Sequence, residues 1–449
     1  MPFIRSISGL RATIGDGLSP HLIAAYTTAF ANTVKGKKIV LGRDGRPSGK
    51  WVEDIVRGTL IACGCEVRLI GVAPTPTVQL EVEHSDASGG IVITASHNPG
   101  EWNGLKFINS DGVFLDEVEN KILWDLVDNL SFKLPDMKYF PDHLHDHDAL
   151  HRHIKKIRRI SSIANNLDSI KSKEFKVVVD AVNSSGSNIV PELLRSFDCE
   201  VIDLFCDGSG LFPHTPEPLP ENLTDLAETV KAVRADIGIA VDPDADRLVL
   251  IDETGKAIGE EKTIALAVES TIIHSTHIGS IVVNLSTSSM SEMTAAKYGF
   301  KTFRAPVGEI NVVKKMKEVG AVIGGEGSGG VILPECHYGR DSLVGIGLIL
   351  NLMSIKNKKL SELSDDLPKL EMLKLKKKYT GSINELRDII AKKYENHQIT
   401  LLDGIRVDFA DGTWFQLRTS NTEPIVRVIA ESPTSGRAEQ LANEIMNLI

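Results

Sequence analysis

Three aspartates at alternate positions form the most chemically specific pattern in the sequence: Asp242, Asp244 and Asp246, followed by Arg247. In an extended segment, residues at i, i+2 and i+4 project to one side. Three hard oxygen donors converging on one point suit Mg²⁺ and leave coordination positions for phosphate oxygens. A calcium loop of the EF-hand type is disfavoured, because Arg247 stands at the turn-glycine position and a strand-like run, 248–251, follows. A solvated acidic turn is the other alternative, but three carboxylates at a strand end repel one another unless a cation compensates.

A serine and a histidine stand together in Thr94-Ala95-Ser96-His97-Asn98-Pro99, directly after the strand-like run 90–93. A strand end is a position where a hydroxyl nucleophile can be displayed. A Ser-His-Asp hydrolase is the usual alternative, but the sequence has no G-x-S-x-G elbow, and adjacent Ser and His rarely form such a triad. Phosphoryl carriage by Ser96 accounts better for the aspartate loop, because Mg²⁺ offsets phosphate charge and polarises the transferring group.

The glycine-dense stretch 324–330 contains one acid, Glu326, and one hydroxyl, Ser328. Neither G-x-G-x-x-G nor G-x-x-x-x-G-K-[ST] is present, which disfavours a nucleotide loop. Glu326 and Ser328 suit hydrogen bonds to sugar hydroxyls, with the glycines allowing close backbone approach. A tight turn accounts for this stretch equally well.

A fourth polar loop, Arg418-Thr419-Ser420-Asn421-Thr422-Glu423-Pro424, combines a guanidinium with hydroxyl and amide donors. This composition is typical of a site for a phosphate dianion, and Arg427 can add a second positive charge. An ordinary Ser/Asn turn ending at proline is the alternative. Further arginines stand at expected loop positions in 8–11 and 42–46.

The elements that must position these loops repeat three times along the chain. Each repeat has a strand, a polar turn with a helix, a second strand, and a third strand that runs directly into a polar loop. The expected third strands are 90–93, 236–240 and 321–323, and they lead into the serine, aspartate and glycine loops. Because ligands gather at the carboxyl ends of strands in open α/β sheets, we expect the three loops to converge on one cleft.

The pattern predicts an α/β protein with three similar domains, whose sheets are mixed and mostly parallel, and a smaller α+β domain at the C-terminal end. The expected domains are 1–145 with the serine loop, 146–252 with the metal loop, 253–364 with the sugar loop, and 365–449 with the phosphate loop. The last domain lacks the repeat and is expected to hold several strands and two helices. Its lysine run, 374–378, is interpreted as solvated lysines that protect an edge strand rather than as a binding patch.

The bulk composition excludes several classes of protein. The chain has 449 residues, of which 42% are hydrophobic and 24% charged, with a net charge of −10. This balance argues against nucleic-acid and anionic-membrane binding. The apolar run 343–350 is far too short for a membrane span, and nothing at the start resembles a signal peptide, so we expect a cytoplasmic protein. The five cysteines form no C-x-x-C pair and are interpreted as reduced and structural, not as ligands of zinc.

The four loops, in this order and over essentially the whole chain, resemble those of the α-D-phosphohexomutase superfamily, which includes phosphoglucomutase, phosphomannomutase and phosphoglucosamine mutase. The resemblance implies four domains around a central cleft. It also implies a relay in which a phosphoserine donates its phosphoryl group to a hexose phosphate. The resulting hexose 1,6-bisphosphate turns around in the cleft and returns its other phosphate to the serine.

Carried over residue by residue, the resemblance implies that Ser96 bears the phosphoryl group, and that this phosphoserine and the three aspartates hold Mg²⁺. It places His97 and Arg247 beside the transferring group and makes Lys106 a general acid or base. Glu326 and Ser328 would bind sugar hydroxyls, with Arg11 and Arg43 as helpers. The non-reacting phosphate would be bound by the fourth loop, through Arg418, Ser420, Asn421, Thr422 and Arg427.

This chain departs from the usual pattern at several positions. Pro243 and Ala245 replace glycines between the aspartates of many bacterial relatives, but the ligands are retained. At Gly330 many relatives carry a histidine, so the group that moves the sugar hydroxyl proton is open, which gives Lys106 more weight. Glu309 occupies a loop position where some relatives use histidine.

Two other functions keep the same pocket: a catalytically silent phosphosugar-binding regulator and a metal-dependent sugar phosphatase. Retention of the serine with all three aspartates disfavours the regulator, and the separate phosphate loop disfavours the phosphatase. A mutase would bind a small phosphosugar, without nucleic-acid or membrane partners, as a monomer or homodimer.

Overall fold

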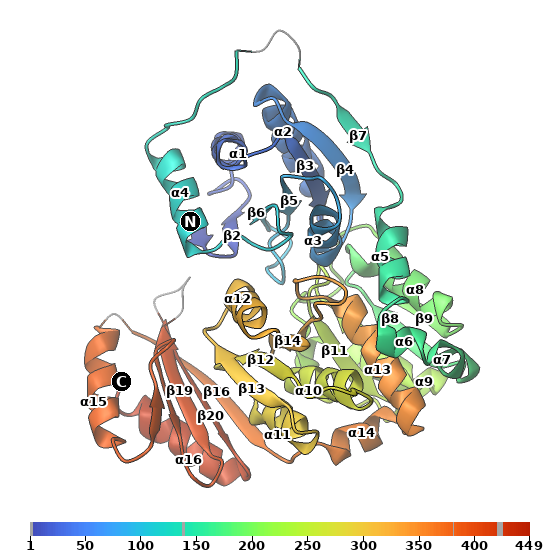
Figure 1. The fold of residues 1–449 in the computed structure, drawn as a ribbon, viewed down its shortest axis with the longest axis vertical. Helices are drawn as coiled ribbons and strands as arrows, with labels where there is room; N and C mark the ends of the chain where they lie inside the picture. The colour runs from blue at the N-terminus through green and yellow to red at the C-terminus, as the bar shows by residue number, and fades with distance from the viewer. Residues whose placement is uncertain (1–2, 137–139, 380, 420–424) are drawn as a thin grey trace.

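The computed structural model describes residues 3–136, 140–379, 381–419 and 425–449. Three α/β domains and a C-terminal domain built on an antiparallel sheet follow one another along the chain, as Figure 1 shows from blue to red. Ser420, Asn421 and Thr422 of the expected phosphate loop lie outside the described residues.

The first domain has a seven-stranded sheet of order β1-β2-β6-β5-β3-β4-β7. Its strands are β1 (Ile4–Ser6), β2 (Gly9–Thr13), β3 (Lys38–Arg43), β4 (Glu66–Val72), β5 (Gly89–Ile93), β6 (Trp102–Ile108) and β7 (His143–His145). Its helices are α1 (Pro20–Thr33), α2 (Gly49–Ala62), α3 (Thr75–Glu83) and α4 (Glu117–Asp128).

The second domain has a sheet of order β11-β10-β8-β9. Its strands are β8 (Lys176–Asp180), β9 (Glu200–Phe205), β10 (Ile237–Val241) and β11 (Leu248–Asp252). The helices around it are α5 (Ala149–Ile157), α6 (Ser161–Ala164), α7 (Leu167–Ser172), α8 (Gly186–Ser196) and α9 (Thr224–Val233), with a 3₁₀ turn at Pro220–Asn222.

The third domain has a sheet of order β13-β12-β14-β15. Its strands are β12 (Ser280–Asn284), β13 (Lys301–Ala305), β14 (Ile323–Glu326) and β15 (Gly330–Ile332). The helices around it are α10 (Glu260–Ile272), α11 (Ser289–Lys297), α12 (Glu309–Val319), α13 (Ser342–Lys356) and α14 (Leu360–Asp366).

The predicted threefold repeat is present in the strand order. In each of the three α/β domains the first strand of the repeat (β3, β8 or β12) lies between the second (β4, β9 or β13) and the third (β5, β10 or β14), and all three are parallel. A fourth strand then returns antiparallel to the third, namely β6, β11 and β15. The third strands β5, β10 and β14 are fully buried, which is why each reads as an apolar or glycine run without alternation.

The apolar run 343–350 lies within the buried part of α13, residues 342–354, and this helix packs against α5, α6, α7 and α10. Because α13 is covered by helices of two domains, its sequence is apolar on all sides. Among the described residues, no helix combines the length and the apolar character that a membrane crossing requires.

The glycine stretch is less of a loop than the sequence suggested. Gly324 and Gly325 lie within β14, paired with Val282 and Val283 of β12, so that only 327–329 form the turn. A side chain at Gly324 would stand 2.3 Å from the Met316 sulfur, so the glycines serve sheet packing as well as the turn.

The C-terminal sheet has the order β16-β20-β19-β18-β17, entirely antiparallel. Its strands are β16 (Glu371–Lys378), β17 (Gln398–Thr400), β18 (Ile405–Asp408), β19 (Trp414–Thr419) and β20 (Ile425–Ser432), with helices α15 (Ile383–Lys393) and α16 (Ser435–Met446). The lysine run lies in the edge strand β16, as predicted. Lys374 is an exception to the solvated set, because its ammonium pairs with Glu260 at 2.7 Å and Glu261 at 2.9 Å on α10.

Candidate active site

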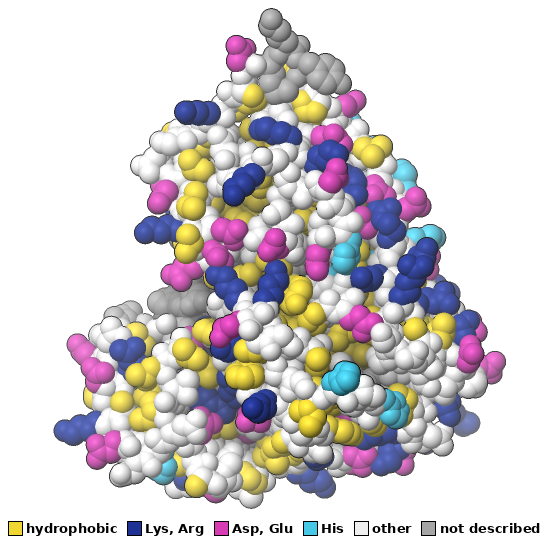
Figure 2. Space-filling model, viewed as in Figure 1, with side chains coloured by type: hydrophobic (Ala, Val, Ile, Leu, Met, Phe, Trp, Pro, Cys, Tyr) yellow, Lys and Arg dark blue, Asp and Glu magenta, His cyan; other side chains and the backbone are white. Residues whose placement is uncertain are grey.

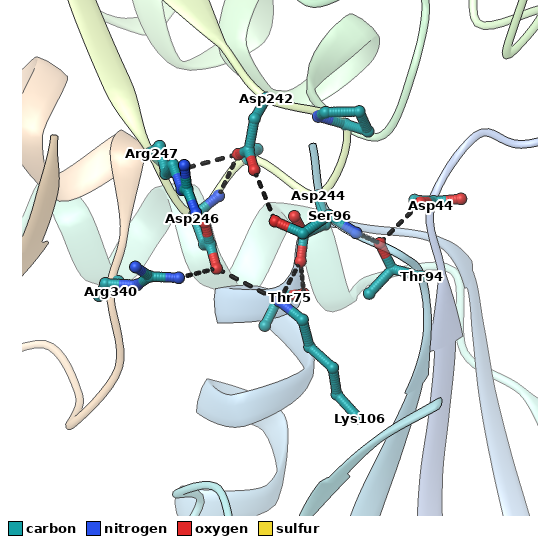
Figure 3. Close-up of polar contacts among 12 residues, drawn as sticks. Asp44, Thr75, Thr94, Ser96, Lys106, Asp242, Asp244, Asp246, Arg247 and Arg340 are labelled. Atoms are coloured by element: carbon teal, nitrogen blue, oxygen red, sulfur yellow. Dashed lines mark hydrogen bonds and ion pairs between the residues drawn. The ribbon is translucent and has the colours of Figure 1, made fainter. Parts of the chain in front are cut away.

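The carboxyl ends of β5 and β10 meet and bring the serine loop against the aspartate loop. The Ser96 hydroxyl donates a hydrogen bond of 3.1 Å to Asp242 Oδ2, although 146 positions separate the two residues (Figure 3). Ser96 and the three aspartates are all buried, with exposed fractions of 1% or less. Two of the three strand-end loops that were predicted to converge therefore meet here, and Arg340 links the third, because it contacts both Asp246 and Glu326.

The serine loop is held in a strained shape by a buried arginine. Ser96 has φ of +51°, a left-handed conformation that costs a non-glycine residue about 1–3 kcal/mol and persists only where the surroundings hold it. The Arg46 guanidinium donates to the carbonyl oxygens of Ser96, Asn98 and Pro99, the last two at 2.7 Å. Arg46 is itself paired with Asp44 at 2.9 Å, so its planar fork is fixed on both sides.

The backbone amide of Ser96 is also tied to this network. It donates to Thr94 Oγ1 at 2.9 Å, and the Thr94 hydroxyl donates to Asp44 Oδ2 at 2.7 Å. These contacts leave the Ser96 hydroxyl as the group of the loop that faces Asp242.

The aspartate loop is a turn rather than the extended segment that its spacing suggested. Asp242 Oδ1 accepts the backbone N–H of Asp246 at 3.1 Å and that of Arg247 at 3.2 Å, and Ala245 has φ of +50°. This side-chain-to-backbone closure is the reason for the turn. The carboxylates still converge: one oxygen from each of Asp242, Asp244 and Asp246 lies within 4.8 Å of the others.

Lys106, on β6, reaches across the domain boundary to two of these carboxylates. Its Nζ lies 2.5 Å from Asp244 Oδ2 and 3.3 Å from Asp246 Oδ2, and the side chain is 2% exposed (Figure 3). Burial alone would lower the pKa of Lys106, but the two carboxylates outweigh it and raise the pKa above its usual value. Thr75, at the start of α3, donates to the same Asp244 oxygen.

The aspartates differ in their proton affinity. Burial, reinforced by the neighbouring Asp246 and Asp244 charges, raises the pKa of Asp242 well above its usual value. For Asp246 burial acts in the same direction, but the Arg340 and Lys106 charges lower its pKa below the usual range. Asp244 Oδ1 and Asp246 Oδ1 are buried and accept no hydrogen bond, although Arg247 Nε lies 3.8 Å from Asp246 Oδ1. Both oxygens are of the kind that Mg²⁺ prefers as ligands.

Arg340 is a site residue that the sequence interpretation missed. It precedes α13 and donates to three carboxylates: Asp246 at 2.6 Å, Glu326 at 2.8 Å and Glu309 at 3.1 Å. The pKa of Arg340 is raised well above its usual value, because these charges exceed the cost of burial. Burial raises the pKa of Glu309 to about 7 in spite of this partner.

His97 and Arg247 stand at the outer side of the site, and both lie 3.9 Å from Glu217. The Arg247 charge, together with burial and the Arg11 charge, lowers the pKa of His97 to about 2. His97 is therefore an uncharged imidazole, whose buried Nδ1 has no hydrogen-bond partner. Arg11, on β2, donates a hydrogen bond of 3.2 Å to the Asn98 side chain and so contacts the serine loop.

The contacts of the remaining predicted residues lie within their own domains. Arg43 pairs with Glu53 at 3.3 Å, and Ser328 is half-buried in the turn between β14 and β15. Arg418 pairs with Asp403 at 3.1 Å, and the register of β19 and β20 places it opposite Arg427. Figure 2 shows the surface hollowed between the first and the C-terminal domain, with charged side chains of both signs around the hollow.

Four family descriptions match the chain in succession. They are phosphoglucomutase/phosphomannomutase α/β/α domain I over residues 4–133, domain II over 151–255, domain III over 260–370, and the C-terminal domain over 370–448. Together they cover well over half of the sequence.

Individual relatives agree with this assignment. The chain is 35% identical to a phosphoglucomutase/phosphomannomutase of Thermococcus kodakarensis, covering 98% of this chain and 96% of the relative. It is 32% identical to a probable phosphoglucosamine mutase of Methanopyrus kandleri over the same shares. Among solved structures, a phosphoglucomutase/phosphomannomutase family protein of Burkholderia thailandensis has the same fold, with a TM-score of 0.84 at 24% identity, covering 99% of this chain and 96% of that one. The chain belongs to the phosphoglucomutase/phosphomannomutase family of the α-D-phosphohexomutases, and its relatives are phosphosugar mutases.

Proposed function

We propose that this enzyme interconverts hexose 1-phosphate and hexose 6-phosphate through a phosphorylated Ser96 and a hexose 1,6-bisphosphate intermediate. The observation that carries the proposal is the 3.1 Å contact between the Ser96 hydroxyl and Asp242, within a set of three buried aspartates from another domain. A structural serine in an acidic surrounding would gain little from the left-handed backbone that displays it.

The donor set fits Mg²⁺. Asp242, Asp244 and Asp246 supply carboxylate oxygens, two of which accept no hydrogen bond, and a phosphoryl group on Ser96 would add a fourth oxygen ligand. A bound Mg²⁺ would neutralise phosphate charge and polarise the transferring phosphorus.

The transfer itself breaks the bond between phosphorus and Ser96 Oγ and forms one between phosphorus and the attacking sugar oxygen. The sugar hydroxyl loses its proton and Ser96 Oγ gains one, so the two protons balance. Lys106 is the proposed proton donor to Ser96 Oγ, because its carboxylate partners keep Nζ protonated, and the proton that the sugar hydroxyl loses returns to Lys106. Arg340, whose pKa is raised further, binds and orients as a permanent cation and does not accept the proton.

The other groups of the site bind the substrate in this proposal. Glu326 and Ser328 bind sugar hydroxyls, with Arg340 orienting the Glu326 carboxylate. Arg247, His97, Arg11 and Arg43 surround the transferring phosphate. The phosphate that does not react is bound at the C-terminal domain by Arg418, Arg427 and the loop between them, so that either end of the sugar can face Ser96.

The substrate class is glucose, mannose or glucosamine phosphate. Relatives named for these sugars align over nearly the whole chain, and one from Sulfurisphaera tokodaii is named a phosphoglucosamine/phosphogalactosamine mutase. We also propose the domain boundaries 1–145, 146–252, 253–364 and 365–449, a cytoplasmic location, and a monomer or homodimer.

One experiment separates the mutase from its alternatives. The protein is incubated with Mg²⁺, glucose 1-phosphate and a trace of glucose 1,6-bisphosphate, and then with the mannose and glucosamine compounds. Formation of the 6-phosphate supports the mutase, release of free phosphate supports the phosphatase, and no turnover of any of the three sugars supports the regulator.

Ser96→Ala is the matched variant, with Ser172→Ala, at an exposed serine of α7, as the serine control. Intact-mass analysis after incubation with the bisphosphate should find one phosphoryl group on the wild type and on Ser172→Ala, and none on Ser96→Ala. A phosphoryl group on Ser96→Ala would refute the assignment of the nucleophile.

A further inference from the structure

A second group of metal-ligating side chains lies where the first three domains meet. His153 is on α5, while Cys336, His337 and Asp341 stand in the segment between β15 and α13. All four side chains are completely buried, and one ligand atom from each lies within 4.8 Å of the others. The magnesium chemistry proposed above uses none of them.

The imidazoles and the carboxylate already face one point. Asp341 Oδ2 lies 2.8 Å from His153 Nε2 and 3.1 Å from His337 Nε2. The thiol of Cys336, the residue next to His337, joins the same group. Two nitrogens, one sulfur and one oxygen are thus gathered from two sequence segments, α5 and the segment between β15 and α13.

The atoms of His153 and Asp341 that point away from the centre are hydrogen-bonded to neighbouring groups, as is usual for metal ligands. His153 Nδ1 lies 2.9 Å from the Thr77 hydroxyl on α3, which can fix the tautomer with its Nε2 lone pair directed inward. Asp341 Oδ1 accepts the backbone N–H of Leu343 at 2.8 Å and of Val344 at 3.4 Å, capping α13 and leaving Oδ2 for the centre. These contacts hold ring and carboxylate orientation independently of the centre.

Hydrogen bonds alone account for only part of this arrangement. Two imidazole N–H groups can donate to Asp341, but this gives the buried Cys336 thiol beside them no role. A thiol, two imidazoles and a carboxylate within reach of one point fit a cation better, because four-coordinate sites built from Cys, His and carboxylate are typical of Zn²⁺. Mg²⁺ and Ca²⁺ prefer all-oxygen ligands.

We propose that His153, Cys336, His337 and Asp341 bind one Zn²⁺ ion that joins the second and third domains beside the active site, with Thr77 of the first domain hydrogen-bonded to one ligand. Four protein ligands leave no open position, so the role is structural. Binding displaces the thiol proton of Cys336 to solvent. The ion would fix Asp341, and with it the neighbouring Arg340 that contacts Asp246, Glu309 and Glu326.

The test uses full-length protein without a histidine tag, grown in medium containing zinc. Elemental analysis after gel filtration is expected to give about one zinc per chain, retained when weakly bound metal is removed with EDTA. The apoprotein, prepared with a stronger chelator, is then titrated with Co²⁺. A thiolate-to-cobalt charge-transfer band is expected, since the aspartate site of the mutase centre contains no sulfur.

Cys336→Ser should abolish that band, whereas Cys65→Ser, at another buried cysteine, should keep it. Thr77→Val, which removes the hydrogen bond between the Thr77 hydroxyl and His153 Nδ1, should weaken zinc affinity by about 10- to 100-fold. Far-UV circular dichroism shows whether each variant folds. If Cys336→Ser does not fold, the zinc content and the cobalt spectrum of the wild type decide.

Wild-type protein without zinc and without a charge-transfer band would overturn the proposal. So would a band that persists in Cys336→Ser. Either result is independent of mutase turnover, so failure here leaves the proposed function untouched.

Discussion

Gly330→Ala is the substitution that best tests whether Arg340 organises the sugar end of the site. A Cβ atom at residue 330 would lie 2.3 Å from Arg340 Cδ and 2.9 Å from its Cγ. Arg340 cannot simply swing away, because its guanidinium donates to Asp246, Glu326 and Glu309 within 3.1 Å. The side chain must therefore shift at its middle and lose at least one of these contacts.

The size of the effect follows from the contacts that would be lost. One hydrogen bond to a charged group contributes about 1.5–3 kcal/mol. If that contact also orients the substrate, kcat/KM should fall by about 10- to 150-fold, since 1.36 kcal/mol corresponds to a factor of ten. Loss of a second contact would leave a buried carboxylate unpaired and lower the free energy of unfolding as well.

The assay compares kcat/KM on the best hexose phosphate with urea unfolding for wild type and variants. Gly58→Ala, within α2, is the matched control, because its Cβ would meet nothing within 4 Å. It should leave kcat/KM unchanged and keep or slightly increase stability. Wild-type kcat/KM in Gly330→Ala would refute the positioning role given to Arg340.

Three further predictions address other parts of the site. Lys106→Met should lower kcat by about 100-fold or more at saturating Mg²⁺, as expected for loss of an acid; a change in KM alone would contradict that role. Arg418→Ala should mainly raise KM, because it removes binding at the remote phosphate, and an effect confined to kcat would be inconsistent with it. Burial lowers the pKa of His214, but the contact with Asp180 at 2.8 Å outweighs burial, and the pKa lies above its usual value of 6.5. Protonated His214 therefore stabilises the folded protein below pH 6.5, and this stabilisation is lost as the pH rises through the folded-state pKa. The difference in unfolding free energy between wild type and His214→Asn should accordingly shrink from about pH 6 to pH 8, and a constant difference would count against this linkage.

The strand-loop pattern predicted the architecture because each third strand is buried on both faces and ends in a polar turn. Continuous apolar or glycine runs such as 237–241 identify such strands, and the order of the following loops identifies the family. The shape of the aspartate turn was less predictable. Ala245 adopts a left-handed conformation because Asp242 accepts two backbone N–H groups, a local effect that residue spacing does not reveal.

Residues brought in by tertiary packing were the ones missed. Arg340 is one arginine between Gly339 and the Asp341 that caps α13, and only the fold brings it to carboxylates of two domains. A charged residue directly before an apolar helix was the available signal. The Cys336 cluster was missed because its ligands do not follow C-x-x-C spacing and one of them, His153, is 183 positions away in sequence.

Lys106 and a divalent cation can share the aspartates, because each carboxylate offers two oxygens. The lysine contacts Oδ2 of Asp244 and of Asp246, while the Oδ1 atom of each accepts no hydrogen bond. A positive charge beside the Oδ1 atoms disfavours the protonated form of Lys106 and so lowers its pKa. The pKa of Lys106, otherwise raised by these carboxylates, would then lie closer to neutral pH. Through these two aspartates, metal binding would increase the acid strength of Lys106, the proposed proton donor, which accounts for the contact of the lysine with both carboxylates.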